Sequence, residues 1–201
     1  MKELIIIRHA RKNVKGEGNV DLINEEALND IEIYGVPGLN EIIKDQTLIL
    51  HSGSAFERTK QTITAFSAYM ANCGDSYHFD GWLPSDIRFG NEDDFAKFMA
   101  NEKIVADAKA TNWFNAFSHH NPNFIKRVQS EMVKAVEEIF SVIDPGTTVI
   151  MVGHTPLIEW LAYAFDPMKK ISRDTKLKEL DGFIFCQNSD GEIKVTGTVG
   201  F

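Results

Sequence analysis

The stretch Leu4–Lys12, which reads LIIIRHARK, decides the fold of this chain and raises the question of its function. Its first four residues are apolar and three of them are β-branched, a run that favours a strand buried on both faces. The run ends in Arg8 and His9, and Arg11 and Lys12 follow closely. Ligands of open α/β sheets bind beside the carboxyl ends of the strands. The stretch therefore indicates either an anion site or a solvated strand end.

The composition is that of an ordinary globular protein. Of the 201 residues, 43% are apolar and 25% are charged, and no apolar run is long enough to span a bilayer or to act as a signal peptide. Cys73 and Cys186 have neither metal-ligand spacing nor the density of a disulfide framework, so we expect a cytoplasmic protein. The net charge of −8 argues against nucleic acid or a membrane as partner.

Strand-like and helical patterns alternate along the chain. The expected strands are the runs TLILHS, YHFDGWL and TTVIMVGH together with the first run, and the expected helices are SAFERTKQTITAFSAYMA, FIKRVQSEMVKAVEEIFSVI and PLIEWLAYAF. Residues 12–35 are expected to form a long loop with a short helix near 25–31, and GLNEIIKDQ, at residues 38–46, is expected to form a helix. A hairpin is expected at the C-terminus, where NSDG separates GFIFCQ from EIKVTGTV.

This order predicts an α/β fold. We expect a three-layer α/β/α sandwich with a mainly parallel central sheet and a small helical insertion. Residues 1–201 are expected to form a single domain, in which the insertion, at about 82–122, covers the site as a lid. Most of the aromatic residues in the insertion are expected to form a small core of its own.

Three motifs stand at strand ends or helix starts: RHA at residues 8–10, SAFERTKQT at 54–62 and VGHTP at 152–156. Together they resemble the histidine phosphatase superfamily, also called phosphoglycerate mutase-like, and the resemblance covers nearly the whole chain. It implies that His9 is the nucleophile and forms a phosphohistidine intermediate. It also implies that Arg8, Arg58 and His154 surround the phosphate, and that no metal or cofactor is needed.

Elementary chemistry agrees with these roles. Phosphoryl transfer needs positioning and positive charge at the equatorial oxygens, which two guanidinium groups supply through forked hydrogen bonds. We expect His154 to be protonated beside a bound dianion. His9 is a competent nucleophile if a backbone carbonyl holds its other ring nitrogen.

Several other residues have two interpretations. Arg11, Lys12 and Thr155 are candidates for the rim of the site, and Ser54 is either a rim residue or only a helix cap. The adjacent His119 and His120 are expected to be surface residues, because the sequence places no cysteine or carboxylate at ligand spacing from them.

The motifs depart from the family pattern in ways that bear on the substrate. RHARKN has Ala10 where many members have glycine, and together with VGHTPLIE it is similar to the short phosphohistidine phosphatases. Those enzymes lack a dedicated acid, because imidazole leaves with little help from a proton. LPSDIRFG, however, resembles the acid-bearing region of other members, with Asp86 at or near the acid position and Glu92 and Asp94 as alternatives.

The expected function is metal-independent hydrolysis of a phosphomonoester on a small phosphorylated substrate. A phosphohistidine phosphatase acting on a phosphoprotein is one alternative. An inactive module that binds or senses a phosphate ligand is the other, and it would keep the pocket without turnover.

Overall fold

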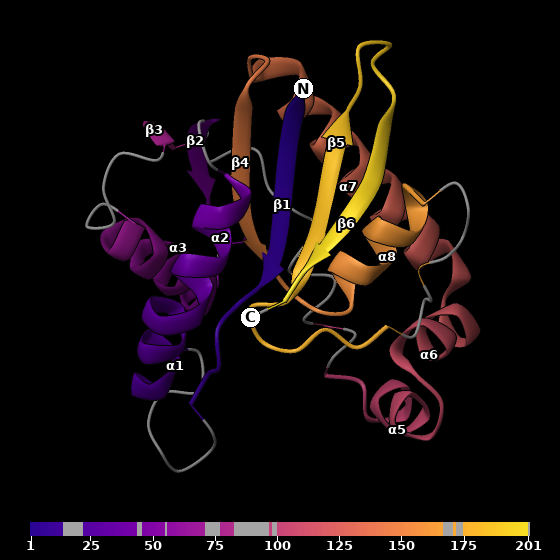
Figure 1. Ribbon diagram of the computed structural model, residues 1–201. Helices are drawn as coiled ribbons and strands as arrows, with labels where there is room; N and C mark the ends of the chain where they lie inside the picture. The colour runs from indigo at the N-terminus through magenta and orange to yellow at the C-terminus, as the bar shows by residue number, and fades with distance from the viewer. Residues whose placement is uncertain are drawn as a thin grey trace.

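The computed structural model describes residues 1–13, 22–43, 46–54, 56–70, 77–82, 97, 100–166, 171 and 175–200. Helices and strands alternate as an α/β fold requires (Figure 1). The elements are β1 (Lys2–Arg8), α1 (Glu25–Asp30), the π-helix η1 (Ile31–Gly35), α2 (Val36–Ile42), β2 (Gln46–His51), α3 (Glu57–Met70), β3 (Tyr77–Trp82), α5 (Glu102–Ala110), α6 (Trp113–His120), α7 (Pro122–Val142), β4 (Thr147–Gly153), α8 (Leu157–Ala164), β5 (Gly182–Gln187) and β6 (Ile193–Val199).

The six strands form one sheet in the order β3-β2-β4-β1-β5-β6. The pairings β3–β2, β2–β4 and β4–β1 are parallel, whereas β5 is antiparallel to both of its neighbours. The α/β prediction is confirmed, but the sheet is mixed. The reason is that the chain enters β5 at the carboxyl end of β1, where the Arg8 backbone NH donates to the Asp181 carbonyl, and must run back along β1.

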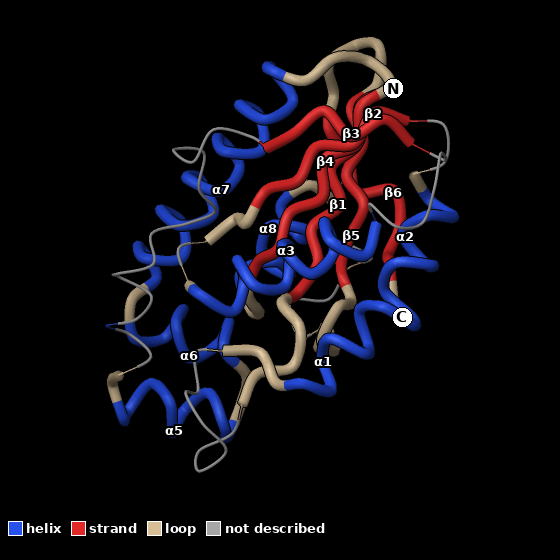
Figure 2. Tube along the Cα trace, turned by 90° about the vertical axis from the view of Figure 1, so that its left-hand side faces the viewer, coloured by secondary structure: helices blue, strands red, loops and turns tan. Residues whose placement is uncertain are grey.

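The central strand β1 is buried on both faces, which explains its uninterrupted apolar run. Leu4 and Ile6 belong to one hydrophobic cluster, which also contains residues of α6, α7 and α8. Ile5 and Ile7 belong to a second cluster, with residues of α1, α2 and α3. Helices therefore lie on both sides of the strands (Figure 2).

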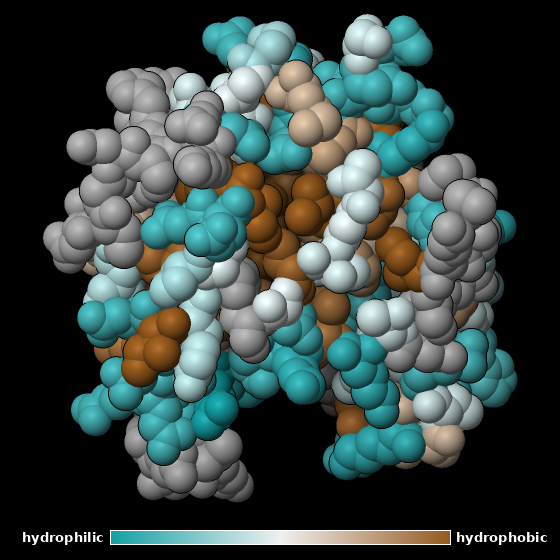
Figure 3. Space-filling view, viewed as in Figure 1, coloured by the Kyte–Doolittle hydropathy of each residue, from teal (hydrophilic) through white to brown (hydrophobic). Residues whose placement is uncertain are grey.

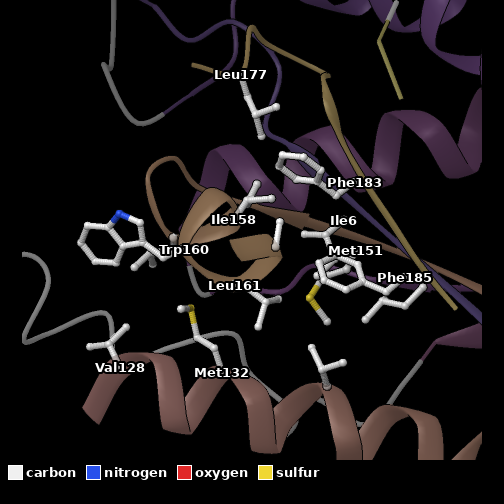
Figure 4. Packing of buried hydrophobic residues seen from close by; sticks show 14 of the residues in the cluster. Ile6, Val128, Met132, Met151, Ile158, Trp160, Leu161, Leu177, Phe183 and Phe185 are labelled. Atoms are coloured by element: carbon white, nitrogen blue, oxygen red, sulfur yellow. The ribbon is translucent and has the colours of Figure 1, made fainter. Parts of the chain in front are cut away.

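The first cluster also contains part of the helical segment that precedes α7. Its centre, with Trp160, Met132 and Phe185, lies between β1, α7 and α8 (Figure 4). Phe117 of α6 is fully buried and packs on Phe124 and Trp160. The expectation that aromatic residues of the insertion form a separate core is therefore wrong for Phe117, which joins α6 to the main core.

The segment 25–42 is helical throughout, where the sequence predicted a short helix near 25–31 and a second helix over residues 38–46. The Asn24 side chain accepts from the Ala27 backbone NH and begins α1, and the chain continues through η1 into α2. Gly35 and Pro37 obscured this pattern. Gly35 lies so close to Phe66 that a Cβ there would press on the ring, and Pro37 is tolerated because it stands in the first turn of α2.

None of the described helices combines the length and the apolar composition that crossing a bilayer requires.

The close approach of β5 to β1 predicts the effect of a single methyl group. A Cβ at Gly182 would overlap the backbone carbonyl of Ile6, so Gly182→Ala should reduce the free energy of unfolding by about 1–3 kcal/mol through overpacking. Gly197→Ala in β6 is the matched control, since its Cβ would make an ordinary contact 3.5 Å from Ile184 Cδ1. Urea unfolding followed by circular dichroism measures both, and equal stability of the two variants would contradict this account.

Candidate active site

The register of two parallel strands brings the two motif histidines together. In the β1–β4 pairing, Arg8 lies opposite Gly153, so His9 and His154 are the next residues on neighbouring strands. The His9 backbone NH donates to the Gly153 carbonyl at 3.1 Å and prolongs the ladder. The two imidazole rings lie 5.1 Å apart between centroids.

His9 is held in one tautomer by the backbone. Its Nδ1 lies 2.7 Å from the carbonyl oxygen of Ala10, which can only accept, so Nδ1 carries the proton and Nε2 has the free lone pair. The Ala10 NH in turn donates to Thr62 Oγ1 on α3. Burial, opposed by the Ala10 hydrogen bond and aided by the Arg58 charge, lowers the His9 pKa from 6.5 to about 4. His9 is therefore a neutral imidazole at neutral pH.

His154 is neutral in the opposite tautomer. The Arg58 guanidinium donates to its Nδ1 at 3.3 Å, so its proton is on Nε2, which donates to Ser54 Oγ at 2.9 Å. Burial and, after it, the charge of Arg58 lower the His154 pKa from 6.5 to about 2. In the free protein His154 is therefore neutral, whereas the expected protonated form concerns the site with a dianion bound.

Arg8 is oriented by the segment that leads into β5. Its Nη1 donates to the Leu177 carbonyl at 2.7 Å, and its Nη2 pairs with Glu179 Oε1 at 3.1 Å. On the other side of the site, the Arg58 guanidinium stacks 4.5 Å above the Phe56 ring, whose edge meets His154. Both guanidiniums are thus held by contacts from separate elements.

These groups line a cavity of about 570 Å³. Its wall includes Arg8, His9, Lys12, Arg58, His154 and Thr155. Figure 3 shows the surface hollowed at its lower edge, below the carboxyl end of β1 and between the α1 side and the α5–α6 side. Three cations beside two neutral imidazoles make this hollow suitable for an anion.

The rim predictions have different outcomes. Lys12 and Thr155 line the cavity, and Ser54 holds His154. Arg11 instead pairs with Glu26 and Asp30 of α1 and is not part of the cavity wall. The three acid candidates lie outside the described residues: Asp86, Glu92 and Asp94.

Several residues at the cavity were not singled out as site residues in the sequence. Phe56 has the spacing of a core position, but its ring contacts both Arg58 and His154. Glu179 and Trp113 come from distant segments that meet only in the fold. The helical spacing of Phe56 just before Arg58 was a usable signal, while the other two carried none.

A second cavity of about 380 Å³ adjoins the first and shares Arg8, Trp113, Thr155 and Pro156 with it. Glu159 of α8 lies in its wall and is buried, with 3% of its surface exposed. Burial raises the pKa of this carboxyl from 4.5 to about 7, against the opposing effect of backbone hydrogen bonds and of Arg8.

No protein-family model and no curated protein matches the sequence, but solved structures match the fold. The phosphoserine phosphatase of Entamoeba histolytica, solved with 3-phosphoglyceric acid, is 12% identical with a TM-score of 0.58, covering 100% of this chain and 98% of its own. A mycobacterial glucosyl-3-phosphoglycerate phosphatase is 14% identical, with a TM-score of 0.55 over 98% and 96% of the two chains. A protein of Agrobacterium tumefaciens described as the phosphohistidine phosphatase SixA is 13% identical, with a TM-score of 0.51 over 98% and 97%. The chain therefore has the fold of the histidine phosphatase superfamily, as its motifs indicated.

The depressed pKa values of the two histidines predict acid sensitivity. Below about pH 6.5 each histidine is protonated in the unfolded chain but stays neutral in the folded site. Each should therefore lower the free energy of unfolding by about 2 kcal/mol between pH 7 and pH 5. His9→Gln should therefore lose less stability over this range than the wild type. Urea unfolding at both pH values measures the difference, and parallel pH dependences would refute the assignment of a lowered His9 pKa.

Proposed function

We propose that the protein is a metal-independent phosphatase that hydrolyses a phosphomonoester of a small substrate through a phosphohistidine on His9. The observation that carries this proposal is the tautomer of His9. The Ala10 carbonyl holds the proton on Nδ1, which leaves a lone pair on Nε2 in a cavity lined by Arg8, Arg58 and Lys12. A neutral nucleophile among cations is what phosphoryl transfer from a dianion requires.

In the first step, His9 Nε2 attacks phosphorus, an N–P bond forms, and the bond from phosphorus to the ester oxygen breaks. Arg8 and Arg58 donate to the phosphoryl oxygens as charge moves onto them. The dianion raises the His154 pKa by its opposite charge, and a protonated His154 donates through Nδ1 once Arg58 has turned from that nitrogen to the phosphoryl oxygens. The leaving oxygen takes a proton from a general acid or from water.

In the second step, water attacks the phosphohistidine, the N–P bond breaks and inorganic phosphate leaves. The lone pair returns to His9 Nε2, and the acid of the first step, now a base, takes the proton of the water. Asp86 remains the proposed acid, with Glu92 and Asp94 as alternatives. Among the described residues the carboxylate in the cavity wall is that of Glu179, which is paired with Arg8.

The adjoining cavity provides space for the part of the substrate that carries the phosphate. Its junction with the phosphate cavity contains Arg8, Trp113 and Thr155, so an ester that bridges the two places its organic part against α5 and α6. This agrees with the proposal that the helical insertion at about 82–122 covers the site. The proposed location is the cytoplasm.

Phosphohistidine hydrolysis is the second candidate function. The pairing of Glu179 with Arg8 favours this function, because a carboxylate held in an ion pair is not free to act as a general acid. A phosphorylated imidazole needs little proton donation when it leaves. The third candidate is an inactive module that binds phosphate, and measured hydrolysis of a phosphate ester would exclude it.

The first test is hydrolysis of p-nitrophenyl phosphate in the presence of EDTA. His9→Ala should abolish turnover, and Arg58→Ala should lower kcat/KM about a hundred- to a thousandfold through loss of one phosphate donor. Arg127→Ala, which removes an arginine stacked on Phe124 of α7, is the matched control and should keep full activity. If the wild type binds phosphate but hydrolyses no ester, an inactive phosphate-binding module becomes the preferred function and the phosphatase proposal is wrong.

A second test separates the two activities by their need for an acid. Asp86→Asn should lower hydrolysis of an alkyl phosphate more strongly than hydrolysis of phosphohistidine, since the alkoxide must be protonated. Glu92→Gln and Asp94→Asn test the two alternative acids in the same way. Unchanged rates in Asp86→Asn on both substrates would remove Asp86 from the mechanism, and unchanged rates in all three variants would favour the phosphohistidine phosphatase.

A further inference from the structure

The helices α5 and α6 bring three metal-ligating side chains together on the surface, away from the site described above. Asp107 lies on α5, and His119 and His120 form the last turn of α6 (Figure 1). Asp107 Oδ2 lies 3.2 Å from His119 Nδ1 and 3.3 Å from His120 Nε2. The three ligand atoms all lie within 4.8 Å of one another.

This juxtaposition corrects the interpretation of the two histidines. They are on the surface, as expected, with 78% of the His119 side chain exposed. The expectation that no carboxylate stands at ligand spacing is wrong, because Asp107, twelve residues earlier in the chain, reaches them across the helix pair.

We propose that Asp107, His119 and His120 bind one divalent transition-metal ion, with Zn²⁺ as the best match. Bonds of 2.0–2.2 Å in a tetrahedral site place neighbouring ligand atoms about 3.3–3.5 Å apart. The two histidine–aspartate separations agree with these values. Two imidazoles and one carboxylate suit zinc or its transition-metal neighbours rather than calcium or magnesium, and exposure leaves a water as the fourth ligand.

The ion would fasten α5 to α6. These helices have nine and eight residues, lengths that are marginal without tertiary support. Trp113, the first residue of α6, lines both cavities, and Ala108, near the end of α5, lines the second. A bound ion therefore strengthens the wall against which the substrate is proposed to lie, although the metal site does not depend on the proposed activity.

Calorimetric titration of the EDTA-treated full chain with Zn²⁺ tests the inference. We expect one ion per chain in the micromolar range, and at least tenfold weaker binding in Asp107→Asn, His119→Ala and His120→Ala. Asp144→Asn, which changes an exposed carboxyl elsewhere, is the matched control and should bind like the wild type. His9→Ala should also keep the ion, which distinguishes this site from zinc held by the buried histidines.

Thermal unfolding gives an independent readout, because a ligand that binds only the folded chain raises Tm. Zinc should raise the Tm of the wild type and of Asp144→Asn, and at the same concentration should raise the Tm of the three cluster variants less. The inference is overturned if zinc fails to bind, or if the cluster variants bind it as the wild type does. Absence of binding would mean that the cluster is an ordinary exposed pairing of histidines with a carboxylate.

Discussion

The parallel pairing of β1 with β4 is the constraint on which the rest of the site depends. Because Arg8 lies opposite Gly153, the two histidines leave the sheet side by side, and the His9 backbone is held by the same ladder that holds the core. A slip of one residue would turn every side chain of β1 to the opposite face and break both hydrophobic clusters. Packing of the core thus determines the relative position of His9 and His154.

Electrostatics explain why the site is neutral at its centre and positive around it. Two buried imidazolium groups beside two guanidiniums would be costly, and the folded chain avoids this cost by keeping both rings uncharged. Glu179 offsets one of the cations through its pairing with Arg8. The described wall of the cavity still carries a net positive charge, since Arg8, Lys12 and Arg58 outnumber Glu179 there.

The sequence predicts the parts of the fold that rest on local pattern, and it fails where distant segments meet. The strands and the terminal hairpin follow from apolar runs and turn residues, and the histidines follow from their place at the strand ends. The helical residues 32–37 between the two predicted helices were missed, since glycine and proline hide a pattern that the Asn24 cap and the packing against Phe66 sustain. Glu179 pairs with Arg8 of β1, and Asp107 pairs with two histidines of the next helix, and no local periodicity in the sequence records such contacts.

The position of Arg8 in the chain has a consequence for folding. Its guanidinium is held by Leu177 and Glu179, and its backbone is bonded to Leu180 and Asp181, residues that are distant from it in the sequence. The central strand also pairs with β4 and β5, whose residues follow it by more than a hundred positions. Contacts so distant in the chain slow folding. The Arg8 side of the cavity is therefore complete only once β5 has docked on β1.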